Sequence, residues 1–262
     1  MNPTTLKVEV QDHVATVTLD RAEVRNAFNE IAIAEIAAAF RALGKEPSVR
    51  VIVLAANGPA FCAGADLHWM QKMAEYSHDE NLADAAQLAE MLRAIYTCPK
   101  PVVARVHGDC YAGGMGLVAA CDIAVVVESA NFCLSEVRLG LAPATIAPYV
   151  IKAMGENAAR RYFLTAERFT AAEALRIGFA HEVVTADELD AKVGVIVQSL
   201  LAGSPNAVRE AKQLVQDVAG VPLSESLIAD TVYRIAAIRA SDEGREGVRA
   251  FLEKRKPGWA SS

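Results

Sequence analysis

The sequence lacks the features of secreted, membrane-spanning and nucleic-acid-binding proteins. Its first residues, MNPTTLKVEV, contain no basic stretch followed by an apolar one, so no secretory signal is expected. The longest apolar runs, such as GLVAACDIAVVV, are interrupted by Asp122 and are too short to cross a bilayer. The formal net charge is -6 and the basic residues are scattered, which does not suggest a nucleic-acid surface. We therefore expect a cytoplasmic protein without membrane or nucleic-acid partners.

The sequence also lacks metal-ligand and disulfide spacing. His107 and His181 have no companions at the spacing of metal ligands, so no metal site is predicted. The cysteines have no CxxC spacing and mostly lie in apolar segments, where free thiols are commonly buried. We interpret them as reduced and structural. They are five in number: Cys62, Cys98, Cys110, Cys121 and Cys133.

What the chain does contain is enough apolar sequence for one large core. Its 262 residues are 53% apolar and 22% charged, a balance typical of a compact globular protein. Alternating β-branched stretches at 6–12 and 13–20 predict an antiparallel hairpin, and Asn29 is a predicted N-cap for a helix reaching about Leu43. Strand-like and helical segments then alternate, which predicts βαβ crossovers and a mostly parallel sheet. The strands are expected at 49–56, 101–108 and 122–128, and the helices at 81–98 and 113–121.

The pattern changes after about residue 185. Three segments, 188–204, 206–220 and 223–240, have helical periodicity with no intervening strand. We therefore divide the chain into an α/β core over 1–200 and a C-terminal helical region over 201–262.

Two glycine-rich turns follow predicted buried strands, where α/β proteins usually build their sites. They are GPAFCAGADL, residues 58–67, and GDCYAGGMGL, residues 108–117. The second runs directly into a helix, so the amides around Gly113 and Gly114 should point outward from its positive end. This geometry suits charge developing on an enolate oxygen, and phosphate binding is the competing use. Neither turn has the P-loop lysine or the GxGxxG spacing, so nucleotide binding is disfavoured, whereas two ordinary tight turns remain an alternative.

Several segments together resemble the enoyl-CoA hydratase/isomerase (crotonase) family, over nearly the whole chain. They are, in order, DRAEVRNAF, AFCAGADL, HGDCYAGGMGLVAACDIAV, FCLSEVRLGLAP and LTAERFTAAEALRIGFAHEVV. The resemblance implies an α/β fold of the ClpP/crotonase type, a spiral of ββα units with a C-terminal helical region used in trimerisation. It implies a homotrimer or homohexamer acting on an acyl-CoA thioester. Coenzyme A would be part of the substrate, and no separate cofactor is expected.

The resemblance also implies roles for residues of the two turns. The backbone amides of Ala65 and Gly113 would form an oxyanion hole for the thioester carbonyl. The coenzyme A channel would be lined by five positions that match the family's motifs: Val24, Arg25, Ala63, Asp66 and Leu67.

One catalytic position departs from the family's usual pattern. Typical hydratases of the family supply two glutamates, and Glu136 matches the second. The first is matched by Gly116, counting back from Cys121 and Asp122, and glycine cannot take a proton. Family isomerases commonly rely on a single glutamate at the second position. If Glu136 lies among apolar side chains, its pKa should be raised.

A second departure lies at Leu141-Ala-Pro-Ala144, where the family often has a glycine-rich turn and this chain has PATIAP. The segment FCLSEVRLGLAPATIAPYV is similar to the methylglutaconyl-CoA and isohexenylglutaconyl-CoA hydratases of leucine and acyclic-terpene breakdown. Such substrates carry a distal carboxylate, so a nearby cation or hydrogen-bond donor is expected. The candidate residues of the acyl pocket are His68, Lys72, Tyr111, Gly116 and Ala144.

Three functions follow from these patterns. The leading prediction is a hydro-lyase that adds water to an enoyl-CoA, with a branched glutaconyl-CoA as substrate. The first alternative is an enoyl-CoA isomerase, which needs only one carboxylate. The second is a non-catalytic member that binds acyl-CoA, against which the retention of Glu136 argues.

Overall fold

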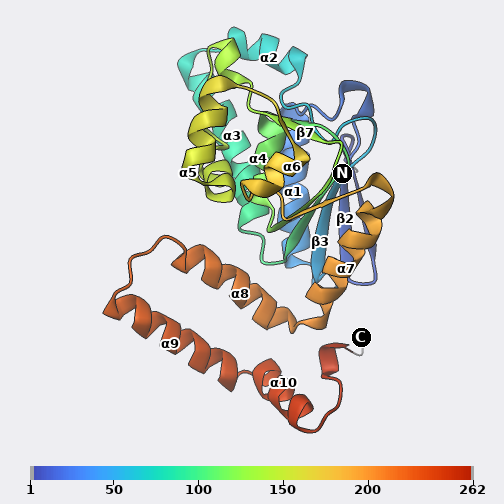
Figure 1. Ribbon diagram of the computed structural model, residues 1–262, viewed down its shortest axis with the longest axis vertical. Coiled ribbons are helices and arrows are strands. Elements are labelled where there is room, and N and C mark those ends of the chain that lie inside the picture. Colours follow the sequence, from blue (N-terminus) through green and yellow to red (C-terminus); the bar gives the residue numbers. More distant parts are fainter. Residues whose placement is uncertain (1–2, 261–262) are drawn as a thin grey trace.

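A computed structural model describes residues 3–260 (Figure 1). Residues 1–2 of the predicted core and 261–262 of the predicted C-terminal region lie outside the described residues. The predicted hairpin is present as β1 (Leu6–Gln11) and β2 (Val14–Leu19), which pair antiparallel. Its two-residue turn, Asp12 and His13, has positive φ at both positions, as a tight hairpin turn with the twist of its strands requires.

The main sheet has the order β1-β2-β3-β4-β6-β9 and is parallel from β2 onward. Its further strands are β3 (Val51–Ala56), β4 (Val102–Val106), β6 (Ile123–Val127) and β9 (Glu182–Val184). Every residue of β3 is buried, which confirms the continuous apolar run as a strand covered on both faces. The predicted parallel sheet is therefore confirmed.

Helices cover both faces of this sheet (Figure 1). One side carries α1 (Glu30–Lys45), α3 (His78–Tyr96), α4 (Gly113–Ala120) and α5 (Ala147–Thr165), and the other carries α7 (Leu189–Ala202). The Asn29 side chain accepts a hydrogen bond from the Ala32 N–H at 3.0 Å, which confirms the predicted N-cap of α1.

A second, small sheet was not predicted from the sequence. It has the order β5-β7-β8 and consists of β5 (Cys110–Tyr111), β7 (Asn131–Cys133) and β8 (Phe169–Thr170). Strands of two or three residues have no measurable periodicity, so only the packing of Cys110, Phe132 and Phe169 into the core reveals them. Short helices complete this end of the molecule: α2 (Leu67–Ala74), α6 (Ala171–Arg176) and the 3-10 turns η1 (Ala22–Val24), η2 (Glu136–Leu139) and η3 (Ala186–Glu188).

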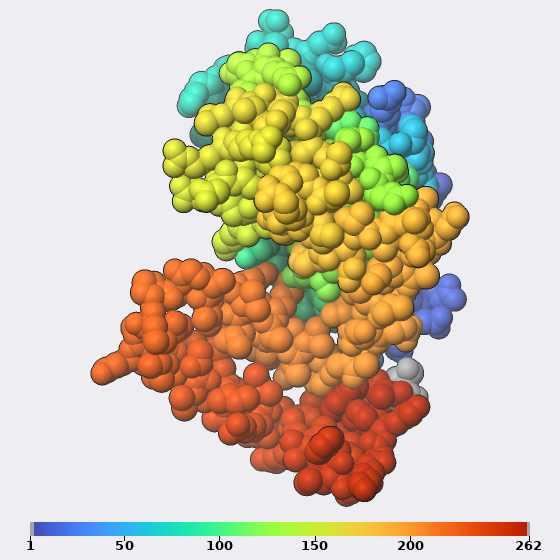
Figure 2. All heavy atoms as spheres, in the orientation of Figure 1, coloured from blue at the N-terminus to red at the C-terminus, as the bar shows by residue number. Residues whose placement is uncertain are grey.

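The chain ends in helices α8 (Pro205–Val218), α9 (Glu225–Ala240), α10 (Asp242–Leu252) and the turn η4 (Gly258–Ala260), with no strand between residues 185 and 260. Their atoms form a lobe set apart from the core (Figure 2). The Lys212 ammonium group attaches α8 to the core through Asp122 Oδ2, at 2.7 Å. The lobe exposes large apolar side chains: Val232, Tyr233, Val248, Phe251 and Leu252.

Candidate active site

The two glycine-rich turns lie side by side, because β3 and β4 are adjacent and parallel and both turns leave the same end of the sheet. The Phe61 N–H donates to the Asp109 carbonyl at 3.0 Å, and the Tyr111 N–H donates to the Cys62 carbonyl at 2.9 Å. A Cβ atom placed on Gly64 would lie 3.7 Å from the Gly113 nitrogen. The structure thus brings the two predicted oxyanion-hole segments into contact.

The first turn leaves the Ala65 amide unpaired. Phe28 bonds to the residues on either side of it: its N–H donates to the Gly64 carbonyl at 2.9 Å, and its carbonyl accepts from the Asp66 N–H at 3.0 Å. In such a parallel bridge, the N–H of the intervening Ala65 points away from Phe28. Across residues 3–260 that N–H has no hydrogen-bond acceptor. Gly64, at φ +93, supplies the bend that only glycine adopts readily.

The second turn presents the Gly113 amide. Gly113 is the first residue of α4, so its N–H has no partner inside the helix, and in the described part of the chain no other acceptor reaches it. The positive end of the helix dipole lies behind it. A side chain on Gly113 would overlap the ring of Phe28, so glycine is required by close packing. Two adjacent, unpaired amides are the arrangement that stabilises negative charge on one oxygen.

Glu136 follows strand β7, which is bonded to the second turn through the Ala112 N–H and the Cys133 carbonyl at 2.8 Å. It begins η2, three residues after β7 ends. Its Oε2 atom is buried and has no hydrogen-bond partner within residues 3–260. Burial raises the pKa of the Glu136 carboxyl, because a charged group is poorly stabilised away from water. A carboxyl group in this state is suited to proton transfer near neutral pH.

The position that the resemblance matches to the family's first glutamate, Gly116, is packed against another side chain. Gly116 lies inside α4 and is buried, and a Cβ atom on it would overlap the Ile146 side chain and lie 3.5 Å from Leu92 Cδ2. Ile146 is 2% exposed and belongs to the PATIAP segment, where the resemblance predicted a departure from the family's glycine-rich turn. The two departures seen in the sequence therefore form one packing unit. Ala144, two residues earlier, is exposed.

The residues expected to line a coenzyme A channel surround the first turn. Val24 ends η1 and is half-buried, whereas Arg25 is exposed and accepts through its carbonyl from the Ala63 N–H at 2.9 Å. Leu67 is 75% exposed and free to contact a ligand. Asp66 is 5% exposed, so it shapes the turn more than it lines an open surface.

Asp66 anchors the first turn through both carboxylate oxygens. Oδ1 accepts from the His68 N–H at 2.8 Å and caps α2, and Oδ2 forms an ion pair with Arg21 at 2.9 Å. Arg21 also donates to the Ala27 carbonyl, and its own N–H donates to the Asn26 side chain at 2.9 Å. Sequence reasoning missed Arg21 and Asn26. Both are polar residues in a segment that the fold largely buries, and this pattern could have marked them as structural hydrogen-bonding residues. Asn26 is 3% exposed.

The three polar candidates for the acyl pocket differ in how they are engaged. His68 is exposed on α2. Lys72 forms an ion pair with Glu30 at 2.5 Å, and this hydrogen bond raises the pKa of Lys72. The Tyr111 hydroxyl donates to Asp109 Oδ2 at 2.6 Å.

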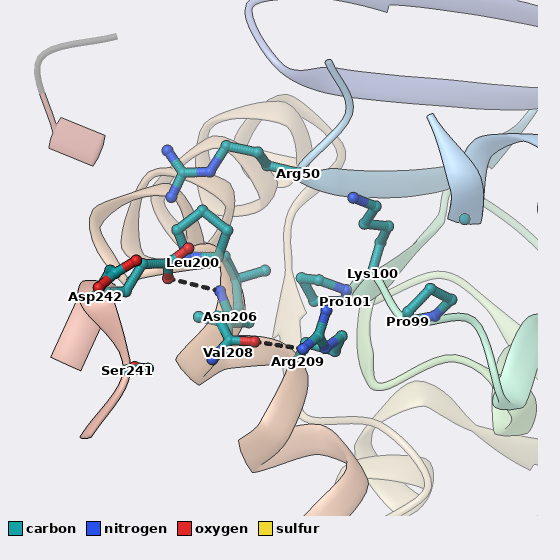
Figure 3. Close-up of a pocket in the computed structure, with 13 residues that line it drawn as sticks. Arg50, Pro99, Lys100, Pro101, Leu200, Asn206, Val208, Arg209, Ser241 and Asp242 are labelled. Atoms are coloured by element: carbon teal, nitrogen blue, oxygen red, sulfur yellow. Dashed lines mark hydrogen bonds between the residues drawn. The ribbon is translucent and has the colours of Figure 1, made fainter. Parts of the chain in front are cut away.

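A cavity lies elsewhere, between the core and the C-terminal lobe (Figure 3). It has a volume of about 400 Å³, and the charged residues around it are Arg50, Lys100, Arg209, Asp242 and Glu243. It contains none of the residues of the two turns, so it is separate from the candidate active site.

No set of three or more His, Cys, Asp or Glu in the described chain could hold a metal ion, and no helix in residues 3–260 is long and apolar enough to cross a membrane.

Comparison with known proteins agrees with this fold. A model of the family described as enoyl-CoA hydratase/isomerase matches residues 9–262. An enoyl-CoA hydratase structure from Shewanella pealeana is similar with a TM-score of 0.96 and 42% identity, over 98% of this chain and 96% of that one. The mevalonyl-coenzyme A hydratase sidH of Aspergillus fumigatus is 35% identical over 95% of this chain and 92% of that protein. A trans-2-decenoyl acyl-carrier-protein isomerase of Streptococcus mutans is 30% identical over 95% of each chain.

The parallel sheet, the small second sheet and the paired glycine turns together constitute a crotonase fold, as predicted. The chain belongs to the enoyl-CoA hydratase/isomerase family and is an enzyme of the hydro-lyase type.

Proposed function

We propose that the enzyme adds water reversibly to an enoyl-CoA, with Glu136 as its only acid/base group. The observation that carries this proposal is the buried, unpartnered Glu136 Oε2, together with the apolar Ile146 at the place of a second carboxylate. The Ala65 and Gly113 amides bind the thioester oxygen and stabilise the enolate that forms when the β-carbon is attacked.

The proton balance of this reaction needs one group acting twice. The Glu136 carboxylate takes a proton from water as the water oxygen bonds to the β-carbon and the C=C electrons move to the thioester oxygen. The same carboxyl group then gives that proton to the α-carbon as the thioester carbonyl re-forms. The raised pKa of Glu136 serves both steps, because it makes the carboxylate a better base without making the acid too weak.

The proposed substrate is a branched glutaconyl-CoA of the 3-methylglutaconyl type. The Aspergillus fumigatus relative is named for mevalonyl-coenzyme A, whose acyl group is also branched at the β-carbon and polar at its far end. In this proposal His68, exposed on α2 next to the first turn, binds the distal carboxylate. Lys72 shares this role only if the carboxylate displaces Glu30.

A second candidate reaction is movement of a double bond between the β,γ and α,β positions. It needs a single carboxyl group to carry a proton from the α-carbon to the γ-carbon, which Glu136 alone satisfies. The Streptococcus mutans relative is named as an isomerase.

We also propose that the enzyme works as a homotrimer or a pair of trimers. The apolar side chains exposed on α9 and α10, Phe251 at 82% among them, support burial against a second copy of the chain.

Mass spectrometry separates the two reactions. Wild type and Glu136→Gln are incubated with 3-methylglutaconyl-CoA and with crotonyl-CoA. The proposal predicts a product heavier by one water from the glutaconyl ester with wild type and none with the variant. A β,γ-enoyl-CoA isomer formed at constant mass would favour the isomerase, and hydration of crotonyl-CoA alone would contradict the proposed substrate.

A further inference from the structure

The residue before the Gly113 amide has a strained backbone. Ala112 has φ 47 and ψ -122, a backbone conformation that residues with a Cβ atom rarely adopt. Such a conformation persists only where flanking contacts hold it. The Ala112 N–H donates to the Cys133 carbonyl at 2.8 Å, which fixes one side of the peptide plane. The direction of the next amide, Gly113, therefore depends on how firmly Tyr111 and Ala112 are held.

Tyr111 is held by its side chain as well as its backbone. Its hydroxyl donates to Asp109 Oδ2 at 2.6 Å, and the Arg168 guanidinium lies over its ring at 5.4 Å from the centroid. Burial raises the pKa of Tyr111 to about 12, so the hydroxyl remains a donor at working pH.

Asp109 connects this side chain to the other parts of the site. Its Oδ1 accepts from the N–H of Asn131 at 3.0 Å and from the Asn131 side chain at 3.2 Å. Its carbonyl accepts from the Phe61 N–H in the first turn. Asn131 begins β7, which leads to Glu136 five residues later. One residue thus joins both glycine turns and the strand that leads to the acid/base group: its carboxylate contacts Tyr111 and Asn131, and its backbone carbonyl contacts the first turn.

We propose that Tyr111 and Asp109 are positioning residues, which hold the strained Ala112 so that the Gly113 N–H points at the thioester oxygen. Neither group touches the reacting atoms in this account. The inference rests on the proposed oxyanion hole, and it departs from the sequence-based assignment of Tyr111 as a donor to the substrate.

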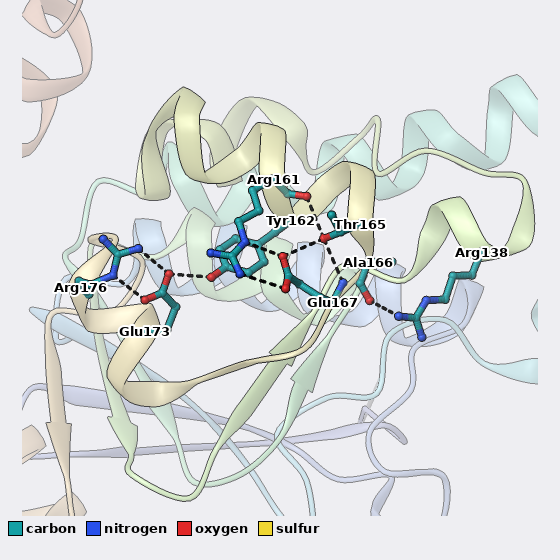
Figure 4. A network of polar contacts seen from close by, with 8 residues as sticks. All are labelled: Arg138, Arg161, Tyr162, Thr165, Ala166, Glu167, Glu173 and Arg176. Atoms are coloured by element: carbon teal, nitrogen blue, oxygen red, sulfur yellow. Dashed lines mark hydrogen bonds and ion pairs between the residues drawn. The ribbon is translucent and has the colours of Figure 1, made fainter.

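The chain offers a matched control in Tyr162 of helix α5 (Figure 4). The Tyr162 hydroxyl donates to Glu173 Oε1 at 2.6 Å, and the Arg161 guanidinium lies over its ring at 5.1 Å. Burial raises the pKa of Tyr162 to about 12 as well. Tyr162→Phe and Tyr111→Phe therefore remove the same chemical group, a hydroxyl that donates to a carboxylate from a ring beneath a guanidinium group. Only Tyr111 lies close to an oxyanion-hole amide, that of Gly113.

The test uses a chromophoric enoyl-CoA, such as cinnamoyl-CoA, whose absorption moves to longer wavelength when its thioester oxygen is polarised. The ester is added to saturation to wild type and to three variants, Tyr111→Phe, Tyr162→Phe and Asp109→Asn. The kcat and KM for hydration of the same ester are measured in parallel. In wild type we expect a clear red shift. In Tyr111→Phe we expect a smaller red shift and a kcat lower by about tenfold at similar KM, which is less than the ~10²–10³ typical of losing an oxyanion donor.

The outcomes distinguish the two proposals. A wild type that binds the ester without a red shift has no working oxyanion hole, and both proposals then fail. A wild-type red shift that Tyr111→Phe and Asp109→Asn retain in full would leave the oxyanion hole standing and overturn the positioning role. Tyr162→Phe should keep the full red shift and kcat. If it loses them as Tyr111→Phe does, the effect is a general loss of packing, which also overturns the inference.

Discussion

The packing of Ile146 against Gly116 can be measured by adding a single methyl group. Gly116→Ala removes a poor helix former from α4, which stabilises a helix by ~1 kcal/mol. The new Cβ, however, would overlap Ile146 Cγ2, and overpacking of a core typically costs ~1–3 kcal/mol. We expect a net destabilisation of up to ~2 kcal/mol.

A second substitution removes the overlapping atom. Ile146→Ala alone should cost ~2–5 kcal/mol, because it leaves a cavity at a residue that is 2% exposed. In that background Gly116→Ala should be neutral or stabilising. A small shift is still needed, since the Cβ of residue 146 would lie 2.9 Å from the new methyl group. The double variant should therefore be more stable than the sum of the single effects by ~1–3 kcal/mol.

Urea unfolding at one fixed protein concentration gives the four free energies of this cycle. Gly194→Ala is the control, because Gly194 lies in helix α7 with nothing within 4 Å of an added Cβ, and it should stabilise by ~1 kcal/mol. Additive effects of the two substitutions, within ~0.5 kcal/mol, would refute the direct packing of these residues. The place of the missing carboxylate would then be open to water rather than filled.

Three further predictions concern other parts of the molecule. Because burial raises the pKa of Glu136 in the folded state, its destabilising effect is absent below pH 4.5 and grows as pH rises through the folded pKa. Glu136→Gln should therefore melt higher than wild type at pH 8 but not at pH 4, and equal melting differences at both pH values would contradict the raised pKa. Arg21→Met should lower the free energy of unfolding in urea by ~3–5 kcal/mol, because it leaves Asp66 charged without its ion-pair partner. Adding Asp66→Asn should recover part of that loss. If it recovers none, the ion pair is not the cause. Phe251→Ser should lower the mass seen in sedimentation without unfolding the chain, whereas an unchanged mass would remove the exposed face of α10 as a subunit contact.

The periodic parts of the fold were predictable from sequence, because their signals are local. The β1–β2 hairpin, the Asn29 cap and the fully buried β3 all followed from residue patterns within a few positions. The small sheet was missed because its strands are too short for a pattern and are formed by pairing across 20 residues or more, as between Cys110 and Phe132.

The same distinction holds in the site. The glycine turns and Glu136 were found from local motifs and family resemblance. The resemblance predicts that Gly116 stands where the family's typical hydratases have a glutamate, but the sequence could not show that Ile146, 30 positions later, packs against this position. Asp109 was missed for a related reason, since its role depends on contacts with Phe61 and Asn131 that only the folded chain brings together.

The central claim is that one carboxyl group performs both proton transfers, and α-proton exchange tests it most directly. Wild type and Glu136→Gln are incubated in D2O with a saturated acyl-CoA, which can exchange its α-protons but cannot be hydrated, and in parallel with 3-methylglutaconyl-CoA. The account predicts that wild type exchanges and hydrates and that the variant does neither. If the variant loses hydration but still exchanges α-protons, a second group serves the α-carbon, and the single-carboxylate mechanism is wrong.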